Sequence, residues 1–231
     1  MKTAHQDQER HTMNHLPTLI FDLDGTLIDS ANSILESLSR VLKEAGTPPA
    51  VPLSEALIGP PLQETLERLC GTSDKKILHS HIASFQKHYD DGGYKKTNVY
   101  PGIDGLLKNL WQSGYIIHIA TNKRLAPTLR IIEHFGWTQH IQSINTLDMH
   151  TPRLPNKTNL LEKLIYQNKI FPHAAIYIGD KPEDGQAATS NSLNFIGVTW
   201  GYGDFMVTQK KNWHIATSAA TLLDHIKNQE Q

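Results

Sequence analysis

Five short apolar segments alternate with amphipathic stretches along most of this 231-residue chain. Each segment is rich in Ile, Val or aromatic side chains, which favour β-strands. The predicted strands cover residues 18–22, 115–121, 141–145, 174–179 and 194–199, and the predicted helices among them cover residues 103–113, 126–135 and 160–166. Such alternation is typical of βα units. We therefore predict an α/β fold: a Rossmann-like core with a mainly parallel sheet and helices on both faces.

One region interrupts this alternation. From about residue 31 to residue 98 every periodic segment predicts a helix, in NSILESLSRVLKEAG, PLQETLERLCG and SDKKILHSHIASFQKHYDDGG, each ended by glycine. A helical block inserted after the first strand should form a separate small domain at the carboxyl edge of the sheet, where open sheets bind their ligands. We predict a disordered polar tail at 1–15, a core of 16–30 and 99–231, and a helical domain at 31–98.

Composition narrows the possible partners. The chain is 39% hydrophobic and 19% charged with a formal net charge of −1, as in an ordinary globular protein. No global basic field would attract a nucleic-acid polymer or a membrane surface. The single cysteine, Cys70, excludes an internal disulfide and fits a reducing compartment. No secretory signal or membrane-spanning run is recognisable, so we expect a cytoplasmic protein. The sequence carries no signal for an oligomeric state.

The stretch FDLDGTLIDS, residues 21–30, places carboxylates at the end of the first predicted strand. Two of them 4 Å apart would repel by about 4 kcal/mol at an effective dielectric near 20, so they need a cation, a shared proton or wide spacing. A polar strand end with a turn is the plain interpretation. The chemical interpretation is that one of the two residues, Asp22 or Asp24, attacks phosphorus with its carboxylate, while the other serves as general acid and then general base.

The residues around this pair fit the same chemistry. Gly25 lets the backbone approach a phosphate, and the N–H groups of the Gly25–Thr26 turn can cradle its oxygens. Asp29 precedes a predicted helix and is expected to be its N-cap residue.

Further polar residues follow in order along the chain. Thr121 and Asn122, in ATNK at a strand end, could donate hydrogen bonds to a phosphoryl group. Lys157 opens a predicted helix and could balance phosphate charge, although a lone lysine is more often a solvated surface residue. Asp180 and Asp184, in YIGDKPEDGQAA, end another strand. Carboxylates from two strand ends with a phosphate between them suit Mg²⁺.

Together these motifs resemble the haloacid dehalogenase superfamily of Mg²⁺-dependent phosphatases, over about residues 16–231. The resemblance implies that Asp22 is the nucleophile and Asp24 the acid/base, and that Thr121 and Lys157 bind the phosphoryl group. It also implies that Asp180, the Asp22 carboxylate and the Asp24 backbone carbonyl hold Mg²⁺, supported by Asp184. The helical insert would be the family's cap, a lid over small phosphorylated metabolites.

Within that superfamily, IGPPLQETL, YPGI and GVTWGYG look like the phosphoglycolate phosphatase group and its nucleotidase-like neighbours. There are two departures: Lys181-Pro182 follows Asp180 where Ser or Thr is frequent, and Thr follows Lys157 where Pro is common. Gly59-Pro60-Pro61 could face the nucleophile, or form a plain helix–helix turn. The cap cations Arg68, His88, Lys95 and Lys96 could contact a substrate, although each is more typical of a solvated surface.

Several functions use such residues. A phosphoglycolate phosphatase, a 5'-nucleotidase, a sugar-phosphate phosphatase and a phosphomutase all remain possible. A dehalogenase would not need Asp24, and a nucleotide switch would need a P-loop that is absent. The non-enzyme alternative is a degenerate regulatory module of the same fold, although such modules usually lose a catalytic carboxylate. We predict a phosphatase that is specific for a small phosphorylated metabolite.

Overall fold

The computed structural model describes residues 16–205 and 213–229. The predicted disordered tail at 1–15 lies outside these residues. Within them, six strands form one parallel sheet in the order β5-β4-β1-β6-β7-β8. The strands are β1 (Thr18–Phe21), β4 (Ile117–Thr121), β5 (Ser143–Thr146), β6 (Ala175–Gly179), β7 (Asn194–Val198) and β8 (His214–Ala216). The five predicted strands are confirmed with small shifts at their ends, whereas β8 was missed.

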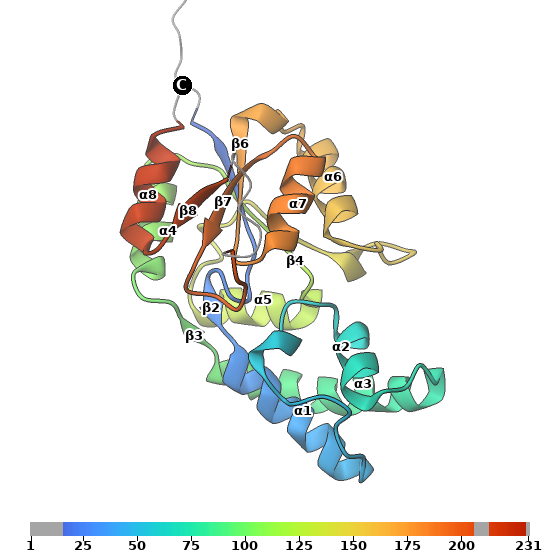
Figure 1. Cartoon of the computed structure of the whole chain (residues 1–231). Helices are drawn as coiled ribbons and strands as arrows, with labels where there is room; N and C mark the ends of the chain where they lie inside the picture. Colours follow the sequence, from blue (N-terminus) through green and yellow to red (C-terminus); the bar gives the residue numbers. More distant parts are fainter. Residues whose placement is uncertain (1–15, 206–212, 230–231) are drawn as a thin grey trace, which may run out of the picture.

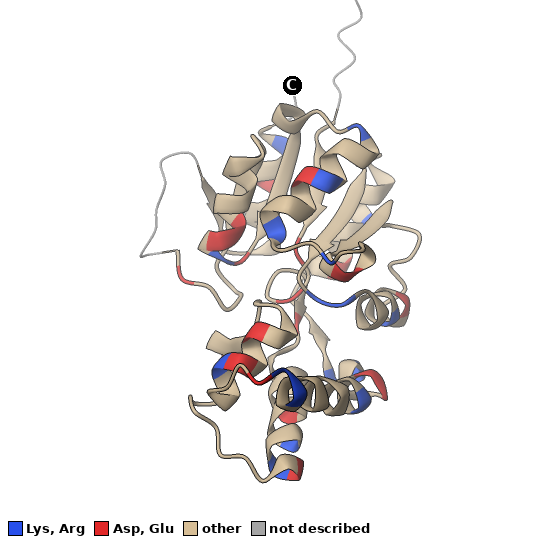
Figure 2. Cartoon of the chain, turned by 90° about the vertical axis from the view of Figure 1, so that its right-hand side faces the viewer, with Lys and Arg blue, Asp and Glu red and all other residues tan. Residues whose placement is uncertain are grey.

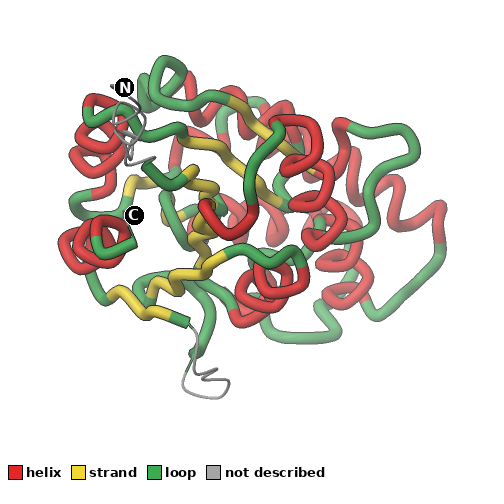
Figure 3. Tube along the Cα trace, turned by 90° about the horizontal axis from the view of Figure 1, so that it is seen from above, coloured by secondary structure: helices red, strands yellow, loops and turns green. Residues whose placement is uncertain are grey.

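Helices cover both faces of this sheet (Figures 1 and 3). One face packs against α4 (Ile103–Gln112), α5 (Leu125–His134) and α8 (Ala219–Lys227), and the other against α6 (Lys157–Asn168) and α7 (Pro182–Ser190). Alternation along β1 explains the two layers, because Leu19 and Phe21 enter the first core and Ile20 enters the second. All three side chains are fully buried. The predicted α/β class with helices on both faces is confirmed.

The inserted segment forms a separate helical layer below the sheet in Figure 1. It contains α1 (Ala31–Ala45), α2 (Leu62–Cys70) and α3 (Lys75–Asp90), with 3₁₀ turns η1 (Glu55–Leu57) and η2 (Gly93–Lys96). These helices bury a core of their own, built on residues such as Leu38, Leu66 and Phe85. We call this layer the cap. It leaves and rejoins the sheet through β2 (Ile28–Asp29) and β3 (Asn98–Val99), which pair antiparallel.

Local signals at the cap helices are partly as expected. Gly46 and Gly71 end α1 and α2 with left-handed backbones, which glycine adopts without steric cost. The third prediction is wrong by one residue, because α3 ends at Asp90 and Asp91, not glycine, takes the position after it; Gly92 comes next. Asp29 is also not the N-cap of α1: Ser30 occupies that position. Asp29 lies one residue before this N-cap position, and its Oδ1 atom accepts a hydrogen bond from the Ala31 N–H at 3.1 Å.

The remaining short elements are the 3₁₀ turns η3 (Leu147–Met149) and η4 (Pro172–Ala174). Figure 2 shows Lys and Arg interspersed with Asp and Glu over both the sheet and the cap. None of the helices in residues 16–205 and 213–229 has the length and apolar character needed to cross a membrane.

Candidate active site

Three carboxylates gather at the carboxyl edge of the sheet. Asp22 follows β1, Asp180 follows β6, and Asp184 lies in the first turn of α7. All three are buried, and each offers an oxygen within 4.8 Å of those of the other two. The parallel pairing of β1 with β6 brings the first two together, because parallel strands end at the same edge.

Glycine backbones make this close approach possible. Gly25 has φ of +85°, and a Cβ there would lie 2.3 Å from the Asp180 Oδ2 atom. A Cβ on Gly201 would meet the Asp180 Cβ atom at the same distance. Any larger residue at either position would therefore displace the Asp180 side chain. Gly201, in the GVTWGYG stretch, was quoted in the sequence only as a family feature, and its packing role required the fold.

Burial and mutual repulsion set the protonation of these carboxylates. Burial, and then the charge of Asp184, raise the pKa of Asp22 to about 6, against the attraction of Lys157. Burial, and then Asp184 and Asp22, raise the pKa of Asp180 to about 8. The Asp22 Oδ1 and Asp180 Oδ1 atoms are buried and have no hydrogen-bond partner among the described residues. Two unpartnered carboxylate oxygens in one buried cluster are ligands of the type that a hard divalent cation prefers.

Lys157 supplies positive charge to this cluster. It is the first residue of α6, and the Asn156 side chain caps that helix by accepting the Asn159 N–H at 3.1 Å. The Lys157 ammonium lies 2.9 Å from Asp22 Oδ2 and 2.6 Å from Asp184 Oδ1. Burial alone would lower the pKa of Lys157, but these two carboxylates outweigh it and raise the pKa well above its ordinary value. Lys157 is thus a buried cation in contact with the expected nucleophile.

The expected phosphate-binding residues lie at the same edge. Thr121 ends β4 and is buried, and its Oγ1 accepts the Lys123 N–H at 3.2 Å. Thr26 is fully buried, and its hydroxyl finds no partner in the described part of the chain. Asn122 differs from the expectation, because its amide donates to the Gly59 carbonyl of the cap at 2.9 Å. Its side-chain donor is therefore engaged by the cap, and a bond from it to phosphate stays a prediction.

Asp24 has a different environment from Asp22, and the residues that make it were missed. The Lys123 ammonium lies 3.0 and 3.2 Å from its two oxygens, and the Ser30 hydroxyl donates to Oδ1 at 2.5 Å. Lys123 also lies over the ring of Tyr89 in α3, 4.6 Å from its centroid. Lys123 is the last residue of the quoted ATNK stretch, and asking what neutralises Asp24 would have found it. The Asp24 side chain is outside the carboxylate cluster, so only its backbone carbonyl could serve the metal as predicted.

Two cavities adjoin the pair of aspartates. The larger cavity, of about 410 Å³, is lined by residues that include Asp22, Lys157 and Asp184. The smaller cavity, of about 70 Å³, is lined by residues that include Asp24, Lys123 and Tyr89. Asn122, Gly59 and Pro60 line both, so the cavities meet where the cap loop approaches the end of β4. The predicted position of Gly59-Pro60-Pro61 beside the nucleophile matches this geometry, because all three residues share the larger cavity with Asp22.

Polar contacts hold the cap against the sheet. Arg124 binds Asp90 of α3 through two nitrogens, at 2.6 and 3.1 Å. Lys181, which departs from the usual Ser or Thr, donates to the Ile58 carbonyl in the loop before α2. The cap cations proposed from the sequence lie elsewhere: His88 pairs with Glu44 and Lys96 with Glu36 on the cap surface. Arg68 and Lys95 line neither of the two cavities.

Trp200 packs at the edge of the core, and Trp200 and Tyr202 also connect parts of the site. The Tyr202 N–H donates to Asp180 Oδ2 at 2.8 Å, and its hydroxyl donates to Asp29 at 2.9 Å. The same hydroxyl accepts the Ser30 N–H at 2.8 Å. The Trp200 indole donates to the Thr26 carbonyl. The segment around Tyr202 therefore links the carboxylate cluster to the start of α1.

Comparison with known proteins identifies one family, among whose relatives are proteins named for different activities. The sequence model of a family described as haloacid dehalogenase-like hydrolase matches residues 19–198. The tyrosine-protein kinase PtkA of Mycobacterium tuberculosis is 32% identical over 205 residues, which cover 88% of this chain and 69% of PtkA. A phosphoglycolate phosphatase of Mesorhizobium japonicum is 30% identical, with 81% and 85% covered. The crystal structure of a predicted phosphatase from Clostridium acetobutylicum superposes with a TM-score of 0.82 at 28% identity, covering 93% of this chain and all of that one.

Proposed function

The chain belongs to the haloacid dehalogenase-like hydrolase family, and on that basis we propose that it is a Mg²⁺-dependent phosphatase acting through an aspartyl-phosphate on Asp22. Family membership and the phosphatases among its relatives support phosphatase activity. The observation that carries the proposal is the buried cluster of Asp22, Asp180 and Asp184 beside Lys157, with Asp24 two residues from the nucleophile.

The reaction divides into two halves. In the first, an Asp22 oxygen attacks phosphorus, the bond to the leaving oxygen breaks, and protonated Asp24 gives its proton to that oxygen. In the second, the Asp24 carboxylate takes a proton from water, the water oxygen attacks phosphorus, and phosphate leaves with the Asp22 carboxylate restored. Lys157 neutralises charge on Asp22 and on the phosphoryl oxygens throughout.

The chain's own residues fit a magnesium ion. Asp22 and Asp180 offer buried, unpartnered carboxylate oxygens, and Asp184 lies next to them. The Asp24 backbone carbonyl completes the predicted ligand set. When bound, Mg²⁺ would neutralise the carboxylates and polarise the phosphoryl group. The chain's residues hold this ion, orient the phosphoryl group and move the protons.

The substrate in this proposal is a small phosphorylated metabolite. Phosphoglycolate is the first candidate from the sequence motifs and the relatives, followed by nucleoside monophosphates and sugar phosphates. Transfer to a second substrate, as in a phosphomutase or a kinase, is the competing function, and the similarity to PtkA favours testing it. A cytoplasmic location, and no role for nucleic-acid polymers or membranes, are further parts of the proposal.

One assay tests these points together. Purified protein is incubated with a panel of phosphomonoesters in Mg²⁺, in EDTA, and in Ca²⁺, and released phosphate is measured. We expect turnover with Mg²⁺, none in EDTA, and inhibition by Ca²⁺, which prefers more ligands at longer distances. Parallel reactions with ATP and a tyrosine-containing polypeptide detect phosphoryl transfer. Full activity in EDTA, or transfer without hydrolysis, would refute the proposal.

A further inference from the structure

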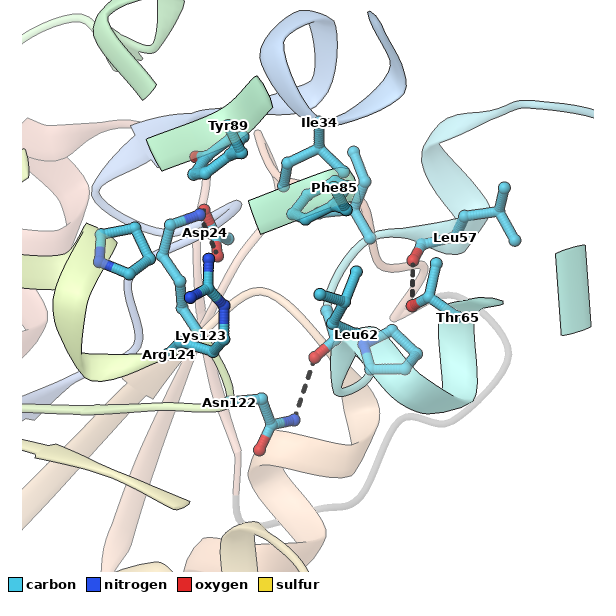
Figure 4. A pocket seen from close by; sticks show the side chains of 14 residues that line it. Asp24, Ile34, Leu57, Leu62, Thr65, Phe85, Tyr89, Asn122, Lys123 and Arg124 are labelled. Atoms are coloured by element: carbon cyan, nitrogen blue, oxygen red, sulfur yellow. Dashed lines mark hydrogen bonds and ion pairs between the residues drawn. The ribbon is translucent and has the colours of Figure 1, made fainter. Parts of the chain in front are cut away.

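The residues that line the smaller cavity beside Asp24 restrict which leaving group a phosphate ester substrate can carry (Figure 4). We propose that this cavity binds the leaving group and that it selects a small, uncharged alcohol of about three carbons. The inference rests on the proposed phosphatase function, and within that function it disfavours phosphoglycolate, the first candidate from the motifs and the relatives. It separates such alcohols from glycolate, which carries a carboxylate, and from nucleosides, which are much larger.

The position of the acid/base residue indicates which part of the substrate this cavity binds. A general acid must be within hydrogen-bond reach of the oxygen that it protonates. Asp24 lines the smaller cavity, whereas Asp22 and Lys157 line the larger one. The phosphoryl group therefore belongs next to Asp22, near the junction of the cavities at Asn122, and the leaving group belongs on the Asp24 side.

Charge in this cavity is already balanced. Among the described residues that line it, the cations are Lys123 and Arg124. Lys123 is paired with both Asp24 oxygens, and the two side chains are only 7% and 10% exposed. Arg124 is paired with Asp90 through two nitrogens. A carboxylate on the leaving group would have to displace one of these partners, and displacing Asp24 would disturb the acid/base itself. A buried charge without its own partner is costly.

The walls and the size favour a compact, mostly apolar group. Figure 4 shows Ile34, Leu62 and Phe85 beside Asp24 and Lys123, and Leu57 lines the same cavity further from them. Its volume of about 70 Å³ is roughly half of the ~150 Å³ that accepts benzene in an engineered apolar cavity. Half of a six-carbon ring corresponds to about three carbons. A nucleoside or a tyrosine side chain would have to extend beyond this cavity.

Two polar atoms would suit a hydroxyl on that group. The Tyr89 hydroxyl and the Asn122 Oδ1 atom are buried, line the cavity, and have no hydrogen-bond partner within the described residues. Asn122 is oriented by its bond to Gly59, which uses the amide nitrogen and leaves the oxygen as an acceptor. A neutral hydroxyl can donate a hydrogen bond to either atom, whereas a carboxylate beside the Asn122 oxygen would be repelled by it.

The test is a matched pair of substrates. 3-Hydroxypropyl phosphate and the phosphate ester of 3-hydroxypropanoate share a three-carbon chain and differ in a terminal alcohol against a carboxylate. Acetyl phosphate, which is small and has a good leaving group, reports the phosphatase chemistry separately. With Mg²⁺ present, we expect kcat/KM to be at least about tenfold higher for the alcohol ester, as a buried unpaired charge would dictate.

A pair of variants locates the effect. Ile34 and Leu35 are adjacent, half-buried residues of α1, and of the two only Ile34 lines the cavity. Ile34→Lys adds a cation there and should reduce the preference for the alcohol ester at least about tenfold. Leu35→Lys should leave that preference unchanged. Circular dichroism confirms that both variants fold, and if Ile34→Lys does not, Ile34→Glu against Leu35→Glu, with an increased alcohol preference expected, replaces the pair.

The outcomes separate the two proposals. No turnover of any ester, acetyl phosphate included, would overturn the proposed function and the inference with it. Turnover of acetyl phosphate together with equal or greater activity on the carboxylate ester would overturn the inference alone, as would acetyl phosphate turnover with none of the alcohol ester. An equal change of preference in the Ile34 and Leu35 variants would place the selection outside this cavity. Larger activity on nucleoside monophosphates would also contradict it.

Discussion

Asp22 and Asp24 are two residues apart, but they belong to opposite ends of the site. Asp22 contacts Lys157 and the carboxylates of β6 and α7, all of them in the sheet and its helices. Asp24 contacts Lys123, Ser30 at the hinge to the cap and, through Lys123, Tyr89 of the cap. Each aspartate has its own buried lysine. We call the first region the phosphate end and the second the leaving-group end.

The difference shows how one short motif can supply two roles. At the phosphate end the carboxylates repel one another, and unpartnered oxygens remain to be satisfied by a cation. At the leaving-group end the single carboxylate is already satisfied by an ammonium and a hydroxyl. A nucleophile and metal ligand suits the first environment, and a residue held in one orientation toward the leaving oxygen suits the second.

The largest expected effects come from removing each carboxylate. Asp22→Asn should lower phosphate release at least about a thousandfold, because the amide is neither nucleophile nor anionic ligand. Asp24→Asn should also stop turnover, but with acetyl phosphate it should still accumulate phosphoryl-enzyme. The leaving acetate needs little protonation, and no base then activates water. Mass spectrometry of acid-quenched protein measures the added phosphoryl group.

Asp224→Asn, a substitution in α8, serves as the control for both variants. Phosphoryl-enzyme in Asp22→Asn, or its absence in Asp24→Asn that still binds substrate, would contradict the separate roles.

A smaller effect is expected from the lysine of the leaving-group end. Lys123→Met removes the cation that holds both Asp24 oxygens in place, so Asp24 should lose the orientation that directs its proton to a poor leaving group. We expect kcat/KM to fall about tenfold or more for 3-hydroxypropyl phosphate, but less than about threefold for acetyl phosphate. Lys108→Met, on the exposed face of α4, is the matched control. Equal losses with the two substrates would mean that Lys123 acts on phosphoryl binding or on the fold, and not through Asp24.

The two ends also differ in how far the sequence could predict them. Asp22, Asp180 and Lys157 each lie at the end of a strand or the start of a helix that periodicity predicts, and the parallel sheet then forces their convergence. Lys123 follows β4 and Tyr89 lies in α3, and their contact depends on how the cap packs on the sheet, which no local pattern encodes. The donor of Asn122 was assigned to phosphate for the same reason, although the cap loop uses it.

Misses in the fold have a similar origin. The strand β8 is three residues long and is defined only by its pairing with β7. The hinge strands β2 and β3 have two residues each and pair Ile28 with Val99 and Asp29 with Asn98, far apart in the sequence, so each strand is stable only through the other. Asp29 was predicted as the N-cap residue of α1, but Ser30 takes that position. The Tyr202 hydroxyl, which is 172 residues from Ser30 in the sequence, bonds both the Ser30 N–H and Asp29, and so holds Asp29 one position before the cap.

The smallest expected effect is thermal, and it again separates the two ends. The pKa values of Asp22 and Asp180 are raised to about 6 and about 8, above the ordinary value of 3.8. The folded protein without metal therefore binds more protons than the unfolded chain between about pH 4 and pH 8, so its unfolding free energy falls as pH rises through that window. Mg²⁺ competes with these protons and should raise the melting temperature more at pH 8 than at pH 5. A gain of 1 kcal/mol corresponds to roughly 2–4 °C in a chain of this size.

Differential scanning fluorimetry at constant ionic strength, with MgCl₂ against EDTA, measures this gain at each pH. Asp180→Asn removes a carboxylate from the phosphate end, so its Mg²⁺-dependent gain at pH 8 should largely disappear. Asp24→Asn changes the leaving-group end, where the side chain lies outside the carboxylate cluster, and most of the gain should persist. Equal gains at the two pH values would contradict the competition between Mg²⁺ and protons. If Asp24→Asn removes the gain as fully as Asp180→Asn does, the cation depends on the Asp24 side chain, and the two ends share one electrostatic site.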